Sequence, residues 1–92
     1  MDPRELNAYF FSLISMFASA GWQQLGKIPD RISGETNTDL KGAQSTIETL
    51  LMLRDKMQGN LTGTEEKLLN DTIATLQSNY AEATAKDSAS PG

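Results

Sequence analysis

The chain has 92 residues, no cysteine, no histidine and a formal net charge of -4. A chain this short forms one small domain that buries about 60 to 65% of the surface of its unfolded form, and without cysteine neither disulfides nor thiolate metal sites supplement its core. Without histidine it lacks the commonest general base and metal ligand. Its net negative charge is unlike that of nucleic-acid-binding proteins, which neutralise phosphates with basic residues. We therefore expect no enzyme, no cofactor or metal, and no nucleic-acid partner.

The first predicted helix is dominated by residues 6–26, LNAYFFSLISMFASAGWQQLG, which carry no charged side chain. Asp2 directly precedes Pro3, a pattern typical of an N-cap followed by proline at the first helical position. Gly26 follows the last apolar residue and is suited to end a helix in the left-handed conformation. The sequence therefore predicts a helix over residues 3–25.

The uncharged run has two alternative interpretations that involve a membrane. A transmembrane helix needs about 20 predominantly apolar residues, whereas this run contains several serine and glutamine side chains that would require partners in lipid. The triplet ASA at 18–20 would suit signal-peptide cleavage, but the preceding segment has one arginine between two acids instead of a basic cluster. We expect instead a helix that packs against protein.

The apolar side chains of this helix occupy a wider arc of its surface than two further helices can cover. At 100° per residue they spread over an arc of about 240°, whereas a surface helix usually has an apolar stripe somewhat over 100° wide. The narrow remainder carries Ala8, Ser12, Ser15 and Ser19. A compact monomer with a few exposed aromatics is one outcome, but the excess favours association with another chain. The predicted interface residues are Phe10, Phe11, Ile14, Phe17, Ala18 and Trp22.

Residues 27–37 contain an interior proline and a glycine and predict a connecting loop. Four of its oxygen-bearing side chains could in principle bind a hard cation, but their spacing does not fit an EF-hand, and capping and solvation account for them. These four are Asp30, Glu35, Asn37 and Asp39. No metal site is predicted.

A second helix is predicted over residues 38–58, with its N-cap among Thr36 to Thr38 and its end at Gly59. Its apolar residues recur at spacings of three and four, which is typical of a helix with one buried face. They are Leu40, Ala43, Ile47, Leu50, Leu51 and Met57.

A third helix is predicted over residues 63–84 because Thr62 and Glu65 have the spacing of a capping box. Its apolar residues follow a heptad-like seam, and the short link before it predicts an antiparallel hairpin with the second helix. The small polar tail, residues 86–92, is expected to be disordered. The seam residues are Leu69, Ile73, Leu76, Tyr80 and Ala83.

A series of motifs runs through the chain: LISMFASAGWQQLGKIPD, SGE and DLKGAQSTIETLLMLRDKMQGNLTGTEEKLL. With these motifs, residues 9–80 resemble the small bacterial family catalogued as domain of unknown function 1844. Members of that family tend to have Asp where this chain has Glu48, Thr where it has Met57, and Arg near Gln77 or Ser78. The most specific positions are Leu25-Gly26, Pro29-Asp30, Ala43-Gln44, Ile47, Leu50, Met52-Leu53, Lys56, Gly59 to Thr62, Glu66 and Leu69.

The resemblance implies a short, cytoplasmic, helical bacterial protein with no established activity, and it supplies no catalytic residues. It also implies that the first helix belongs to the shared domain, which argues against a cleaved signal or a membrane span. We expect an all-α fold of three helices in one domain, residues 1–85, with the first helix packed on the hairpin formed by the other two and in an oligomer interface.

The expected function is that of a non-catalytic helical module for oligomerisation or protein binding. We expect a homo-oligomer, a dimer or a larger assembly, or a complex with another protein. The alternative is a peripheral membrane protein whose first helix lies in the lipid interface. Interfacial helices usually carry Lys or Arg on their polar face, and here that face carries serine, which disfavours the alternative.

Overall fold

The structure, a computed structural model, describes residues 5–29 and 32–89. The described residues form three helices, and within them no strand is present beyond an isolated bridge between Leu25 and Thr38. This confirms the predicted all-α fold. The helices are α1 (Ala8–Gln24), α2 (Leu40–Lys56) and α3 (Gly63–Ala89).

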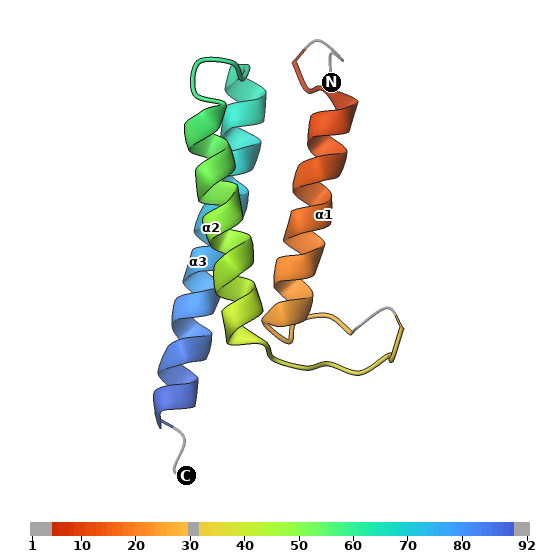
Figure 1. Cartoon of the computed structure of the whole chain (residues 1–92), viewed down its shortest axis with the longest axis vertical. Coiled ribbons are helices and arrows are strands. Elements are labelled where there is room, and N and C mark those ends of the chain that lie inside the picture. Colours follow the sequence, from red (N-terminus) through yellow and green to blue (C-terminus); the bar gives the residue numbers. More distant parts are fainter. Residues whose placement is uncertain (1–4, 30–31, 90–92) are drawn as a thin grey trace.

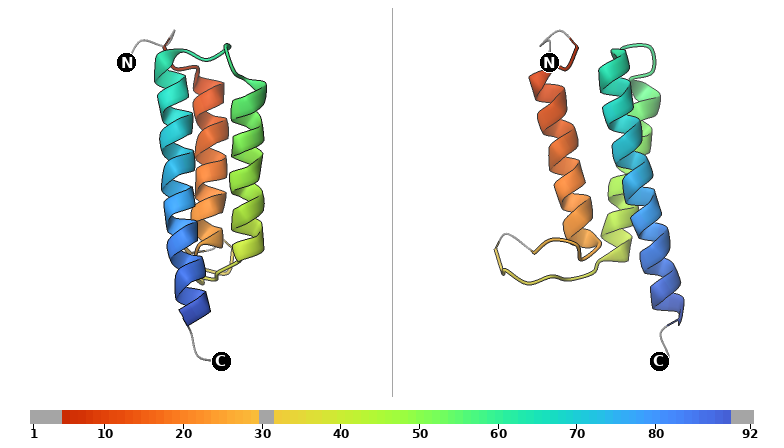
Figure 2. Two further views of the ribbon diagram at one scale, coloured as in Figure 1. Left: turned by 90° about the vertical axis from the view of Figure 1, so that its left-hand side faces the viewer. Right: turned by 180° about the vertical axis from the view of Figure 1, so that it is seen from behind.

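Each helix packs against the other two. Figure 1 shows the chain descending through α1, rising through α2 and descending again through α3. Figure 2 shows α1 lying against the α2 and α3 pair, with the end of α3 extending beyond the other two helices. The helix α3 has 27 residues against 17 in each of α1 and α2, which accounts for this overhang.

The core forms where the apolar stripes of the three helices meet. The middle of the α1 stripe faces inward, and Gly21 lies so close to α3 that an added Cβ would come within 2.8 Å of Leu76 Cδ2. The other core residues come from the apolar positions predicted for α2 and α3. Their burial confirms the predicted spacing of apolar residues in both helices. The buried apolar residues are Phe10, Ile14, Leu25, Ala43, Ile47, Leu50, Leu69, Ile73 and Leu76.

The start of α1 differs from the prediction. Asn7 is the N-cap, and its side-chain oxygen accepts hydrogen bonds from the backbone N–H groups of Tyr9 and Phe10 at 2.9 and 3.1 Å. The backbone N–H of Asn7 donates to Oε2 of Glu65 at 2.8 Å, so it is not available for a helical turn that begins earlier. The predicted start at residue 3 is therefore wrong, and the predicted Asp2 cap lies outside the described residues.

The junction between α1 and α2 is held by hydrogen bonds across a long connection. Gly26 has φ +74°, which confirms it as the left-handed residue that ends α1. The N-cap of α2 is Asp39, whose Oδ1 accepts from the Gly42 N–H at 3.0 Å, so the prediction of Thr36 to Thr38 is wrong by one residue at its nearest. The Asp39 N–H donates to the backbone oxygen of Gln24 at 2.6 Å and ties the two helix ends together.

A side-chain contact reinforces this junction. The hydroxyl of Thr46 and the side-chain amide of Gln24 are 2.6 Å apart and are hydrogen-bonded in either orientation of the amide. With its nitrogen turned toward Thr46, the amide also donates to the carbonyl oxygens of Ala20 and Gly42, each at 3.1 Å. Thr46 is buried, so this pair satisfies a polar group inside the α1 and α2 contact.

The start of α3 is the predicted capping box. The Glu65 N–H donates to Thr62 Oγ1 at 3.2 Å, and the Thr62 N–H donates to Glu65 Oε1 at 3.0 Å. The helix then continues to Ala89, five residues beyond the predicted end at 84 and into the segment expected to be a disordered tail. Residues 90–92 of that tail lie outside the described residues.

Candidate interaction surface

The side of α1 that faces away from the bundle is the most distinctive surface of the chain. We call it the outer face of α1. It carries three large apolar side chains in water: Tyr9 is 88% exposed, Met16 60% and Phe11 46%. No residue of the face is charged. The face consists of Tyr9, Phe11, Ser12, Ser15, Met16, Ser19, Ala20 and Gln23.

A shallow hollow of about 490 Å³ lies along this face. Its floor is formed by Ser15, Ser19 and Ala20, whose short side chains leave space beside the longer Phe11 and Met16. The lining offers apolar carbon and serine hydroxyl groups but no charge, so it has no group suited to acid–base or metal chemistry. Its form suits an uncharged side chain from another molecule.

The six predicted interface residues do not lie together on one exposed face. Phe10 and Ile14 are buried by the chain itself, at the centre of the α1 stripe. Phe17 and Trp22 are half-buried and pack against the core, and Trp22 also lines a slot of about 190 Å³ with Ala18 and three residues of α3. Phe11 alone of the six belongs to the outer face. That these residues contact another chain stays a prediction.

Tyr9 and Met16, which are exposed on the outer face, were not among the predicted interface residues. Both occur in the wide apolar arc of the helix, but an arc does not reveal which part of it faces the other helices. Gly21 marks the side that faces α3, because an added Cβ there would meet Leu76 at 2.8 Å. Measured from Gly21 at 100° per residue, Met16 lies about 140° away and Tyr9 about 120° away.

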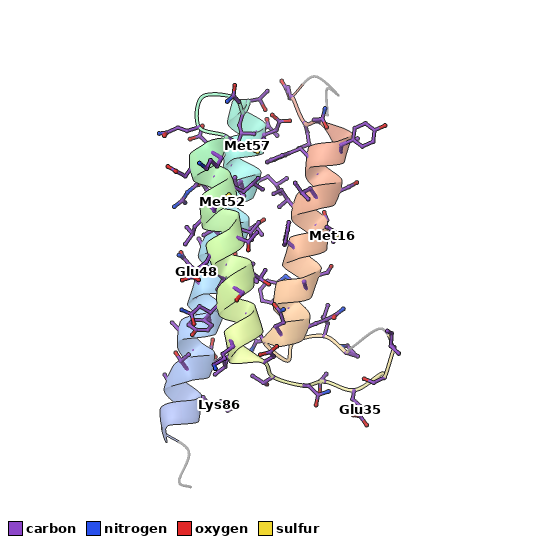
Figure 3. The ribbon with its side chains drawn as sticks, viewed as in Figure 1. Met16, Glu35, Glu48, Met52, Met57 and Lys86 are labelled. Carbon is purple, nitrogen blue, oxygen red and sulfur yellow. The ribbon has the colours of Figure 1, made fainter. Side chains whose placement is uncertain are left out.

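The remaining large apolar residues with high exposure are Ile28 and Ile32 in the α1 to α2 connection and Met52 on α2. Figure 3 shows Met52 and Glu48 on α2 and Met16 on α1. These other residues share no helix face with Tyr9, Phe11 and Met16. Of the three helices, α1 is therefore the one in the described chain with three such side chains, and at 100° per residue Tyr9 and Met16 lie at one margin of its outer face and Phe11 at the other.

Glu65 is the one buried carboxylate in the described part of the chain. Its pKa is lowered mainly by the hydrogen bond from the Thr62 N–H and then by that from the Asn7 N–H, with burial opposing the shift. The hydroxyl of Thr62 in addition donates to the carbonyl oxygen of Glu5, so residues 5–7 and residues 62–65 are joined at one point. Both carboxylate oxygens are occupied by backbone donors, which suits a structural role and not proton transfer.

The pKa of Lys67 is also shifted, by an interaction at the surface of the chain. The ammonium of Lys67 donates to Asp71 Oδ2 at 2.7 Å, one turn along α3, and this hydrogen bond raises the pKa of Lys67.

Within residues 5–29 and 32–89 no three acidic or metal-binding side chains are grouped so as to hold a metal ion. In the same residues, no helix combines the length and apolar character needed to cross a bilayer.

Comparison with known proteins gives one match. The model of a protein family described as a domain of unknown function, DUF1844, matches residues 7–82. The matched region begins at Asn7, the N-cap of α1, and includes α1, α2 and most of α3. No curated protein and no solved structure matches the chain.

Proposed function

The chain belongs to the DUF1844 family, and we propose that it acts without catalysis, as a small helical module that associates with a second copy of itself through the outer face of α1. In this proposal α2 and α3 form an antiparallel hairpin that supports α1 and keeps its outer face in place. A cytoplasmic location is part of the proposal and rests on the family resemblance.

The observation that carries the proposal is that the outward half of α1 has no charged residue and leaves Tyr9 and Met16 exposed at one margin and Phe11 at the other. Grouped large apolar side chains in water are typical of interaction surfaces, whereas single ones are ordinary. Aromatic residues and methionine are also enriched in the buried centres of protein interfaces, from which charged residues are depleted. The outer face has this composition.

A second copy is the partner that the charges favour. Every charged residue lies outside residues 6–26, and the chain as a whole carries -4, so each copy in a pair brings a net negative charge to the complex. Two outer faces meet without burying any charge, which avoids the desolvation cost of an unpaired ion. Self-association through this face therefore meets the least electrostatic opposition.

The test is light scattering after size exclusion on the wild-type chain and two matched variants. Met16→Glu introduces a charge on the outer face, where Met16 is 60% exposed, and Met52→Glu introduces the same charge on α2, where Met52 is 49% exposed. We expect Met16→Glu to be a folded monomer and Met52→Glu to keep the wild-type mass. Equal masses for all three proteins would contradict the proposal.

The same two variants also test the lipid interface as the alternative occupant of the outer face. Exposed Tyr9 and Phe11 would suit such an interface, but α1 has no Lys or Arg to contact anionic headgroups. We expect the wild-type chain to remain in the supernatant when centrifuged with vesicles of mixed zwitterionic and anionic lipid. Co-sedimentation that is lost in Met16→Glu but kept in Met52→Glu would favour the membrane function.

A further inference from the structure

We propose that the first turns of α1 and α3 form one cooperative unit, which opens while the rest of the three-helix bundle stays closed. Proteins commonly open in such local units, at a smaller free-energy cost than that of global unfolding. A unit of this kind is a conformational device, because it lets a change at the start of α3 reach the turn of α1 that carries Tyr9 and Phe11. The coupling does not require that two outer faces associate.

Glu65 holds the backbone of both turns with one carboxylate. Its Oε2 accepts from the N–H of Asn7, the N-cap of α1, at 2.8 Å, and its Oε1 accepts from the N–H of Thr62, in the capping box of α3, at 3.0 Å. The hydroxyl of Thr62 also donates to the carbonyl oxygen of Glu5. If α1 opens at its start, Glu65 loses one of its two backbone donors and Thr62 loses an acceptor, so the first turn of α3 loses part of its support.

The start of α1 is less buried than the rest of the helix. Among residues 5–12 only Phe10 is buried, whereas Ile14, Gly21 and Leu25 are buried further along. Local opening is easiest where few apolar contacts are buried. The start of α1 is therefore expected to open at a lower free-energy cost than the remainder of the helix.

The start of α3 has the same character. Among residues 62–67 only Glu65 is buried, and the first buried apolar residue of the helix is Leu69. From Leu69 onward the apolar seam is covered by the other helices, with Leu76 fully buried. The first turn of α3 therefore depends on the hydrogen bonds of Glu65 more than on apolar burial.

A hollow of about 300 Å³ lies beside the two turns. Phe10, Met57 and Leu61 line it together with Glu65. Side chains that border an empty space lack packing partners on that side, so the apolar contact between the start of α1 and the end of the hairpin is incomplete. This increases the share of the attachment that the hydrogen bonds of Glu65 supply.

The other end of α1 is attached without Glu65. The backbone oxygen of Gln24 accepts from the Asp39 N–H at 2.6 Å, and the Gln24 side chain is hydrogen-bonded to Thr46. Gly21 lies close against Leu76 of α3. These contacts hold the helix in the bundle when its first turn opens, so the opening stays local.

Hydrogen exchange followed by NMR measures the opening of each helix start separately. The N–H groups of Phe11, Glu66 and Ala43 each donate at 2.9 Å to the backbone oxygen four residues earlier, and they report on the starts of α1, α3 and α2 in turn. Magnetisation transfer from water covers the fastest of these amides. Ala43 is the internal reference, because α2 is capped by Asp39 and not through Glu65.

Asn7→Ala removes the side-chain cap of α1 and keeps the backbone N–H that bonds to Glu65. We expect exchange at Phe11 to become about fivefold faster, the usual effect of losing such a cap. We expect exchange at Glu66, in the other helix, to become at least about twofold faster and that at Ala43 to keep its rate. Glu65→Gln is expected to accelerate Phe11 and Glu66 together, by about fivefold or more.

Asn79→Ala is the matched control, since the Asn79 side chain donates within α3, to the Thr75 backbone oxygen at 2.8 Å, about 21 Å along the helix from Glu65. It is expected to leave all three rates at their wild-type values. A faster Phe11 with an unchanged Glu66 in Asn7→Ala would show that the two turns open separately, which overturns the inference. Equal acceleration of all three amides would show that the turns open only when the whole bundle unfolds, which overturns it as well.

Discussion

The backbone N–H of Asn7 donates to Oε2 of Glu65, 58 residues later in the chain, at 2.8 Å. The other oxygen of the same carboxylate accepts from the Thr62 N–H at 3.0 Å. One side chain therefore links the start of α1 to the start of α3. Since Asn7 in turn caps α1, Glu65 helps to hold the first turn of α1 against α3.

Replacing Glu65 with Gln is expected to lower the thermal midpoint of unfolding. The amide keeps one acceptor oxygen but turns an NH₂ group toward a backbone donor, which leaves one of the two N–H groups without its partner. Glu66→Gln is the matched control, because Glu66 is exposed and its side chain is not part of the capping box. Thermal unfolding followed by circular dichroism checks this, and equal midpoints for the two variants would contradict it.

The contribution of Glu65 is expected to depend on pH. In the folded chain the pKa of Glu65 is lowered from its ordinary value of 4.5 by the backbone hydrogen bonds of Thr62 and Asn7. The folded state therefore holds the ionised form more strongly, and this stabilisation is complete above the unfolded pKa and disappears as the pH falls through the folded pKa.

Urea unfolding of the wild type and Glu65→Gln measures this dependence between neutral pH and about pH 3. The difference in their free energies of unfolding is expected to stay constant above the ordinary pKa of 4.5 and to decrease below it. A difference that persists undiminished to the lowest pH would show that the carboxylate charge is not involved.

Gly21 is expected to tolerate no side chain without loss of stability. In Gly21→Ala the new Cβ would lie 2.8 Å from Leu76 Cδ2, so α1 and α3 must separate or Leu76 must move, at a cost of about 1–3 kcal/mol. Gly63→Ala is the control, since an added Cβ there meets nothing within 4 Å. The control is expected to change the free energy of unfolding by less than about 1 kcal/mol, and a stabilising Gly21→Ala would show that this contact is loose.

Removing the hydroxyl of Thr46 is expected to weaken the α1 and α2 junction. Thr46→Val removes the hydroxyl that pairs with the Gln24 amide and should cost about 1–2 kcal/mol in urea unfolding. In Thr75→Val the lost hydroxyl donates within α3, to Asp71 O, at an exposed position, and the expected change is within about 0.5 kcal/mol. Similar losses in both variants would assign the effect to helix propensity instead of the Gln24 contact.

Local signals predicted the parts of the fold that depend on neighbouring residues. The Thr62 and Glu65 capping box is present, Gly26 adopts positive φ, and the seam residues Leu69 and Ile73 are buried. Each of these features is determined within one or two helical turns, where spacing and side-chain chemistry are visible in the sequence.

The predictions that were wrong depend on distant residues. The start of α1 is set at Asn7 by Glu65, and no local pattern around Asp2 and Pro3 reveals that partner. The position of the outer face on α1 also depends on residues far away in the chain. The apolar arc of α1 was visible, but the part of it that α2 and α3 cover is fixed by the close approach of Gly21 to Leu76. Phe10 and Ile14, which were predicted to contact another chain, are buried in the core, and that contact stays a prediction.

The central claim is that the outer face of α1 joins two copies of the chain. Sedimentation equilibrium of the wild-type protein over a series of concentrations from below one to about 100 micromolar tests it most directly. We expect a mass that rises from the 10.0 kDa of a single chain toward twice that value as concentration increases. A mass that stays at 10.0 kDa over the whole series would contradict it.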